Sequence, residues 1–239
     1  NSGATLADSS GLGNAAFLTC AAAACVSTPT LAAGPSGLGG AVAFSGLNHG
    51  LVRVPDAAAY AFTDSVSIEA WVNPDTTSQP DGAGLVVRGS GTVENFALDI
   101  FGGRYRFQPT PGAAVVSTNA VTAGTWTHLI GVYDAVAGSA TLYVNGRPAA
   151  AVLSVPARLA ADHDISIGNR QSGLATPYDR GFLGRIDSVR VLRRALNAAE
   201  ALAEFEGGFV STVTPASPNQ RVLIGLPPNA FGASAALLV

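Results

Sequence analysis

Apolar and polar residues alternate along much of the chain, with the period of two expected of strands that bury one face. In residues 65–74, SVSIEAWVNP, one face carries Ile68, Ala70 and Val72. Residues 125–134, TWTHLIGVYD, are apolar on both faces, as expected of a strand in the middle of a sheet. The same reading predicts further strands within residues 38–55, 84–88, 95–101, 104–108, 140–150 and 165–168.

Turn residues separate these segments about every eight to twelve positions, which is typical of a β-sandwich. Gly102–Gly103 and Asn145–Gly146 are both strong hairpin signals. One short helical pattern follows the last strand, with Asn197 as its N-cap and Gly207 as its end. The sequence therefore predicts an antiparallel all-β sandwich with one short helix over residues 197–206.

Composition narrows the possible functions. A chain of 239 residues with 12% charged residues can bury one large core. Its net charge of −3 argues against nucleic acid as a partner, and no apolar run reaches the roughly 18 residues that would permit membrane insertion. The chain opens with Asn1 and contains no methionine, so we expect it to be part of a longer protein.

The two cysteines, Cys20 and Cys25, flank four alanines. Neither is part of a zinc-binding pattern, because no further cysteine or suitably spaced histidine accompanies them. A disulfide between them would indicate an oxidising compartment outside the cytoplasm, and we predict a secreted or cell-surface protein. The alternative is a pair of free thiols packed in an alanine-rich turn.

An aspartate near the end of the chain is expected to be buried. In the segment FLGRIDSVRVL, strict alternation places Asp187 on the same face as Val189 and Val191, which should point into the core. An ionised carboxylate there needs backbone donors, an arginine or a metal ion, because an unpaired buried charge is costly.

Several motifs together resemble the laminin G-like jelly rolls of the concanavalin A-like superfamily, over residues 5–206. In chain order they are D-x-S-G-x-G-N at 8–14, G-G-A-V-x-F-x-G at 39–46, S-I-E-A-W-V at 67–72, G-T-W-x-H with Y-D at 124–134, L-Y-V-N-G at 142–146, and G-x-I-D-x-V-R-x-x-x-R-A-L at 184–196. The resemblance implies a jelly-roll domain over residues 1–208, followed by an extension over 209–239.

The same resemblance implies a structural calcium ion. Its ligands would be Asp8, Asn14 and Asp187 together with the carbonyl oxygens of Gly11 and Gly13, since calcium prefers oxygen ligands. The ion would join the first turn to the closing strand. The alternative is that Asp187 pairs with an arginine and that Asp8 only forms a turn.

Catalysis is not expected. Retaining glycoside hydrolases of this fold place two carboxylates about 5–5.5 Å apart, in the pattern Glu-x-Asp-x-x-Glu. No acidic residues here have that spacing, and Glu94 and Asp99 would lie on opposite faces of a strand. We therefore predict that the protein is not an enzyme.

Two regions are candidates for ligand binding. Glu69, Trp71 and Asn73 share the strand face opposite the core, where an aromatic ring beside polar groups would suit a sugar. The alternative is that Trp71 packs under a loop. The second candidate is the loop NRQSGLATPYDR at 169–180, with Arg170, Tyr178 and Asp179. Long loops at 74–83 and 109–121 could also carry recognition.

These observations predict an extracellular recognition or adhesion module that binds glycan or protein at a cell surface. The alternative is a structural subunit of a filament or surface layer. In that case the apolar segment RVLIGL at 221–226, within the 209–239 extension, would allow self-assembly by adding a strand to a neighbour.

Overall fold

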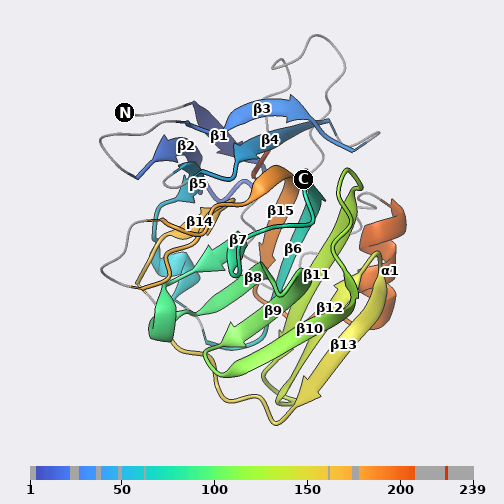
Figure 1. Ribbon diagram of the computed structural model, residues 1–239. Helices are drawn as coiled ribbons and strands as arrows, with labels where there is room; N and C mark the ends of the chain where they lie inside the picture. The colour runs from blue at the N-terminus through green and yellow to red at the C-terminus, as the bar shows by residue number, and fades with distance from the viewer. Residues whose placement is uncertain are drawn as a thin grey trace.

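The computed structural model describes residues 4–21, 27–35, 39–47, 50–61, 63–160, 162–173, 178–207 and 224–225. Two antiparallel β-sheets pack face to face, and one α-helix lies outside them (Figure 1). This arrangement confirms the predicted β-sandwich. Of the 209–239 extension, the description covers Ile224 and Gly225 alone.

The first sheet contains eight strands, each antiparallel to its neighbours. From one edge to the other they are β10 (Ala113–Ala120), β9 (Arg104–Thr110), β8 (Phe96–Phe101), β7 (Ala83–Arg88), β14 (Ile165–Ile167), β5 (Gly50–Val54), β2 (Ala16–Cys20) and β1 (Thr5–Asp8). Short 3₁₀ turns at Ala58–Tyr60 and Gly91–Val93 follow β5 and β7.

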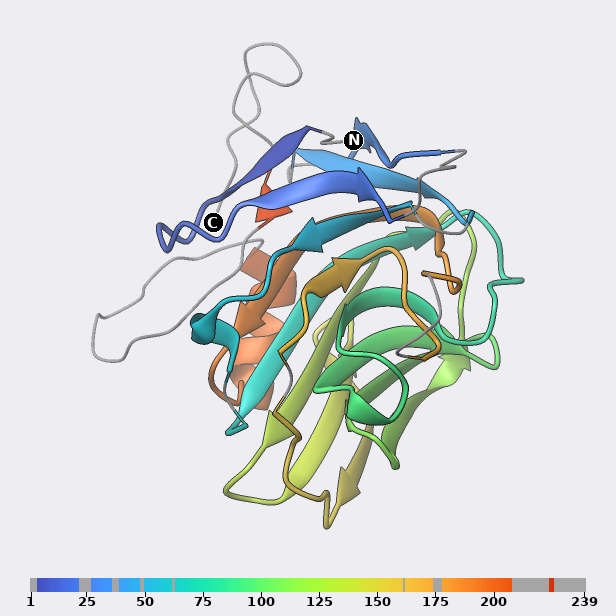
Figure 2. The same ribbon diagram turned by 90° about the vertical axis from the view of Figure 1, so that its left-hand side faces the viewer.

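The second sheet contains, in spatial order, β13 (Arg147–Leu153), β12 (Ser139–Val144), β11 (Thr127–Asp134), β6 (Val66–Pro74), β15 (Leu183–Leu192), β4 (Gly40–Ser45) and β3 (Thr30–Ala33). Helix α1 (Ala198–Gly207) lies against the outside of this sheet (Figure 2). The short strand β16 (Ile224–Gly225) pairs with β1 at the edge of the first sheet and with β15 of the second sheet, and so it links the two sheets.

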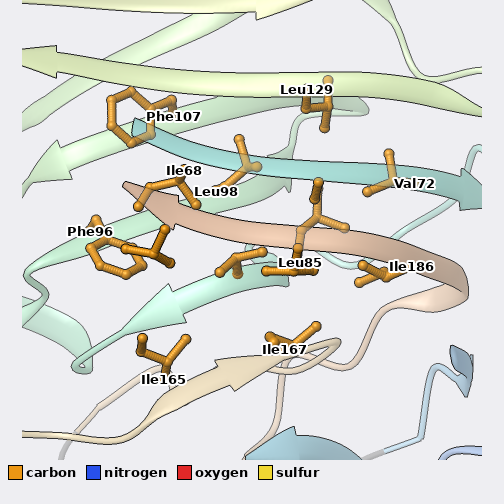
Figure 3. Packing of buried hydrophobic residues seen from close by; sticks show 14 of the residues in the cluster. Ile68, Val72, Leu85, Phe96, Leu98, Phe107, Leu129, Ile165, Ile167 and Ile186 are labelled. Atoms are coloured by element: carbon orange, nitrogen blue, oxygen red, sulfur yellow. The ribbon is translucent and has the colours of Figure 1, made fainter. Parts of the chain in front are cut away.

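The hydrophobic core fills the space between the sheets (Figure 3). Ile68 and Val72 of β6 point into it, as their alternation predicts, and belong to the same buried cluster as Leu98 and Phe107 of the first sheet. Each such side chain contributes about 1.5–3 kcal/mol by leaving water. Gly131 faces the Phe107 ring so closely that a Cβ atom would clash, which explains the glycine in the middle of an apolar strand.

The segment at 109–121, which we expected to be a long loop, contains strand β10. Pro109, Pro111 and Gly112 gave it the appearance of a loop, but a period of two begins directly after them. Val115 and Ser117 are buried, whereas Val116 and Thr118, which alternate with them, are exposed. Pro111 and Gly112 therefore mark the β9–β10 connection, whereas Pro109 lies within β9.

Strand β15 contains a bulge that overturns the predicted orientation of Asp187. Ser188 has a positive φ of 49°, and the pairing register with β6 shifts between Asp187 and Arg190. Asp187 is paired with Trp71, so both side chains lie on the outer face of the second sheet, while Val189 points into the core. Strict alternation failed here because a bulge adds one residue to one strand. Asp187 is nevertheless buried, with 6% of its surface exposed.

Helix α1 begins as predicted. The Asn197 side-chain oxygen accepts a hydrogen bond from the Glu200 backbone N–H at 3.0 Å, and the Glu200 carboxylate accepts one from the Asn197 N–H at 2.8 Å. This reciprocal pair is a capping box. Among the described residues, no helix is long and apolar enough to cross a membrane.

Candidate functional site

The first candidate ligand face, at Glu69, Trp71 and Asn73, is covered in the structure. Helix α1 places the Phe205 ring 5.8 Å from the Trp71 ring, and the His128 ring lies 4.9 Å from Trp71 on the same face. Glu69 is 1% exposed, and Asn73 is also buried. The expectation of an exposed binding face here was therefore wrong. The tryptophan does pack under another element, but that element is the helix.

The polar groups of this face hold the helix in place. The Glu69 carboxylate lies 3.0 Å from Nε2 of His128 and 3.1 Å from Nη1 of Arg190. Arg190 also donates hydrogen bonds to both oxygens of Glu204 in α1, at 2.5 and 2.9 Å. Because Arg190 bridges a strand residue and a helix residue, the cluster has a structural role.

The second candidate region brings Arg170 onto the outside of the first sheet. Its guanidinium group donates to both oxygens of Glu94, at 2.6 and 2.7 Å, and to Asp99 Oδ2 at 2.6 Å. The loop residues Tyr178 and Asp179 lie apart from this contact. Asp179 accepts hydrogen bonds from Ser172, and Tyr178 forms a β-bridge with Gln171. Residues 174–177 of this loop lie outside the described part of the chain.

A second arginine completes a network on the same face. Arg106 of β9 makes a bidentate pair with Asp99, with distances of 2.9 and 2.6 Å. We call Glu94, Asp99, Arg106 and Arg170 the arginine–carboxylate network. Both carboxylates are buried. Burial raises the pKa of Glu94, and the adjacent guanidinium of Arg170 opposes that rise.

The network corrects the expectation that Glu94 and Asp99 lie on opposite faces of one strand. Strand β8 begins only at Phe96, and Glu94 lies in the preceding connection after the 3₁₀ turn at Gly91–Val93. Both carboxylates therefore reach the same guanidinium. All four carboxylate oxygens accept hydrogen bonds, so neither group has the accessible surface that a catalytic acid or nucleophile requires.

An exposed aromatic residue lies beside the network. Phe101, at the end of β8, is 44% exposed, and its ring centroid is 4.2 Å from the Arg106 guanidinium carbon. Val116 is paired with Arg106 across β9 and β10 and is also exposed. We call Phe101, Arg106 and Val116 the Phe101 platform. This platform was not predicted from the sequence, although Phe101 shares a strand face with Asp99 and precedes a two-residue turn, which together are a usable signal.

The structure does not bring Asp8 and Asp187 together. The Asp8 carboxylate accepts hydrogen bonds from the N–H groups of Ser10 and Asn14, at 2.9 and 2.8 Å, so it stabilises its own turn. Strand β16 lies between the strands that carry the two aspartates. Two strand spacings amount to about 10 Å. Calcium ligands lie only about 2.3–2.6 Å from the ion.

Gly11 and Gly13, whose carbonyl groups were predicted ligands, lie in the Asp8 turn with positive φ values of 78° and 77°. They are therefore on the Asp8 side of β16. The described residues contain no group of three or more His, Cys, Asp or Glu side chains arranged to hold a metal ion. Cys20 ends strand β2, whereas Cys25 lies outside the described residues, so their disulfide stays a prediction.

Asp187 has an incomplete environment of its own. Its Oδ1 accepts a hydrogen bond from the Ser188 N–H at 2.7 Å, but Oδ2 is buried without a partner among the described residues. Burial raises the pKa of this carboxyl from 3.8 to about 7. A Cβ atom on Gly34 would lie 2.5 Å from Asp187 Oδ2 and 2.8 Å from the Gly39 carbonyl oxygen. Two oxygen atoms thus converge on the space beside Gly34.

Together, these features define a lectin-type β-sandwich with an exposed aromatic platform. A family model described as the concanavalin A-like lectin/glucanases superfamily matches residues 46–201, well over half of the chain. The chain belongs to this superfamily, as its motifs imply. No curated protein sequence matches it.

Solved structures with the same fold include domain 4 of AbnA, an extracellular arabinanase from Geobacillus stearothermophilus, in complex with arabinotriose. That likeness has a TM-score of 0.64 and 20% identity, and covers 82% of this chain and 91% of that one. A heptameric pentraxin from Limulus polyphemus has a TM-score of 0.56 and 14% identity, and the likeness covers 76% of this chain and 89% of that one. A putative carbohydrate-binding protein from Bacteroides ovatus has a TM-score of 0.53 and 20% identity, and the likeness covers 68% of this chain and 45% of that one. At these identities the likeness concerns the fold alone.

Proposed function

We propose that the chain is a non-catalytic, extracellular recognition module that binds glycan through the Phe101 platform. The observation that carries this proposal is the exposed Phe101 ring beside the Arg106 guanidinium. An aromatic ring offers a flat apolar surface to the C–H face of a sugar, and a guanidinium group offers donors to its hydroxyls. Two of the similar structures are named for carbohydrate binding or contain a bound saccharide, which fits this proposal.

The arginine–carboxylate network makes the platform rigid before any ligand arrives. Arg106 is held from one side by both oxygens of Asp99 and from the other by the Phe101 ring. Arg170 fixes Asp99 in turn. A side chain that is already ordered loses little conformational entropy on binding, so more of the contact energy appears as affinity.

The carboxylates beside the platform support a non-catalytic role. Glu94 and Asp99 are the two acidic residues that face one another across a guanidinium near the platform, and both are buried in ion pairs. A retaining or inverting mechanism needs one carboxyl group that protonates the leaving group and a second that attacks or activates water. Neither carboxylate has access to a bound saccharide.

Replacement of Phe101 by alanine is expected to weaken glycan binding about tenfold or more, because the stacking surface is lost. The melting temperature should change little, since the ring lies at the surface. The ligand would be found on a glycan array that includes arabinan oligosaccharides, and its affinity measured by isothermal titration calorimetry. Val136→Ala is the matched control, because Val136 is a 97% exposed apolar residue in the β11–β12 turn. Equal affinity of Phe101→Ala and the unaltered protein would contradict the proposal.

We further propose that Asp187 takes part in a calcium site. The support is its unpartnered Oδ2 and the convergence of that atom with the Gly39 carbonyl oxygen beside Gly34. Calcium accepts carboxylate, carbonyl and water oxygens, and water would complete its six to eight ligands. The larger predicted shell, with Asp8, Asn14, Gly11 and Gly13, requires β16 to leave its place between β1 and β15.

Calcium in hundredfold excess over its dissociation constant is expected to raise the melting temperature by about 5–10 °C relative to a chelator. Asp187→Asn should abolish this response, which differential scanning calorimetry would measure. Asp8→Asn distinguishes a calcium site that contains Asp187 without Asp8 from the larger shell that contains both. A retained response places the ion at Asp187 without Asp8, and a lost response places Asp8 in the shell. If calcium leaves the melting curve of the unaltered protein unchanged, the proposal is wrong.

A further inference from the structure

We propose that a cleft at one end of the sandwich binds a single neutral sugar residue, an inference that rests on the proposed glycan recognition. The cleft lies between the β9–β10 edge of the first sheet and the turn that joins β12 to β13 in the second sheet. Its volume is about 170 Å³. The polar side chains that line it include Tyr105, Ser117, Asn119, Thr122, Thr125 and Asn145. We call this the Tyr105 cleft.

The lining matches the chemistry of an uncharged sugar. Apart from Ala120 and Val144, the described side chains that line the cleft carry hydroxyl or amide groups, and none of them carries a formal charge. Hydroxyls and amides both donate and accept hydrogen bonds, which suits the hydroxyl groups of a saccharide. A volume of about 170 Å³ has room for several water molecules, and therefore for the ring of one sugar residue.

Tyr105 provides an independent sign of a missing partner. Its side chain is in the hydrophobic core and only 4% exposed. The Thr127 side chain, which also lines the cleft, lies near the Tyr105 hydroxyl, but no described group meets that hydroxyl in normal hydrogen-bond geometry. Buried hydroxyl groups are nearly always paired, because an unpaired one has lost its water without compensation. Burial also raises the pKa of Tyr105, so its hydroxyl is neutral and can donate a hydrogen bond.

The neighbouring groups fix the shape of the cleft. The Ser117 hydroxyl accepts a hydrogen bond from the Tyr105 N–H at 3.2 Å and donates one to the Asn119 carbonyl at 2.8 Å. The Asn145 side-chain oxygen accepts one from the His128 N–H at 2.9 Å. These contacts hold the walls, while the exposed Thr122 and Thr125 stand at the rim. The walls are therefore formed before a ligand enters.

The lining also predicts discrimination against acidic sugars. A carboxylate placed in the cleft would lose hydration without meeting a cation. The nearby Arg104 is not part of the lining: it lies on the same side of β9 as Arg106, opposite Tyr105, where its guanidinium group donates to the backbone carbonyls of Ser117 and Thr118. Neutral pentoses and hexoses should therefore bind in preference to the corresponding uronic acids.

The cleft and the Phe101 platform lie at the same end of the first sheet. Phe101 and Arg104 flank the Gly102–Gly103 turn, and Tyr105 is the next residue along β9. The Phe101 side chain lies on the outer face of the first sheet, whereas the Tyr105 side chain points between the two sheets. The two surfaces are on opposite faces of one hairpin, so each can be altered without removing the other.

The test uses saturation-transfer NMR and calorimetry on the whole chain with arabinose, xylose, glucose, galactose, glucuronic acid and galacturonic acid. At least one neutral sugar should bind, and its uronic counterpart should not. Tyr105→Phe removes one hydroxyl and keeps the ring, so we expect binding about tenfold weaker. Thr125→Val, at an exposed position, should weaken binding of the same sugar. Tyr60→Phe is the control, since Tyr60 is another buried tyrosine and should leave binding unchanged.

The outcomes separate this inference from the proposed function. If Tyr105→Phe and Thr125→Val both bind the neutral sugar as well as the unaltered protein does, the cleft holds only water and the inference is wrong. If glycan binding depends on Phe101 but not on Tyr105, the proposed function stands without the cleft. If a monosaccharide depends on Tyr105 while Phe101→Ala has no effect, the cleft stands without the platform. Absence of any saccharide binding overturns both.

Discussion

Replacement of Arg170 by alanine is expected to lower the free energy of unfolding by about 3–5 kcal/mol, the usual effect of breaking a buried ion pair. Arg170 donates to both oxygens of Glu94 and to one of Asp99, and the two carboxylate side chains have no exposed surface. Without the guanidinium group, the hydrogen bond from Gln108 at 3.2 Å is the only one that Glu94 keeps with the described residues. A buried carboxylate would then lack its counter-charge. Urea unfolding followed by circular dichroism would measure the loss.

The matched control is Arg185→Ala. Arg185 pairs with Asp75 at 3.6 Å, and both side chains are exposed. Exposed ion pairs contribute only about 0–1 kcal/mol, so this variant should unfold close to the unaltered protein. If the two arginine variants lose the same stability, the arginine–carboxylate network does not hold the loop against the first sheet.

In the presence of a chelator, the protein is expected to lose about 4 kcal/mol of stability through Asp187 as the pH rises from about 4 to above 7. The pKa of this carboxyl is 3.8 when unperturbed and about 7 in the folded protein, because burial disfavours the charged form. Between these values the folded state binds more protons than the unfolded state. The stabilisation is therefore complete below the lower pKa and is lost as the pH rises through the upper one.

Asp187→Asn isolates this effect, since the amide has the same shape and does not titrate. In chelator the variant should be more stable than the unaltered protein above pH 7, and its stability should depend less on pH. Asp162→Asn is the control, because the Asp162 side chain is almost fully exposed. Thermal unfolding across pH 4–8 would measure all three proteins. Parallel pH profiles for Asp187→Asn and the unaltered protein would show that Asp187 stays ionised throughout.

Local patterns in the sequence were sufficient to predict most elements of the fold. The alternation in residues 65–74 gave the core face of β6, and the spacing of Asn197 and Glu200 fits the capping box that begins α1. The two-residue turn at Gly102–Gly103 fixes the β8–β9 register, so the Asp99–Arg106 pair follows from it. Such features depend on residues close together in the chain, where the period of a strand and the geometry of a turn leave few alternatives.

The site depended on contacts that no local pattern specifies. Arg170 and Glu94 are 76 positions apart, and only the packed loop brings them together. Helix α1 covers Trp71, which by alternation alone faces solvent. The bulge at Ser188 turned the Asp187 side chain to the outer face of the sheet, opposite to the face that alternation predicts. The sequence by itself determined which residues form strands and which faces are apolar, because period and turn chemistry are local. The tertiary structure decided which outer faces are covered and which carboxylates find partners, because those outcomes depend on how distant segments pack.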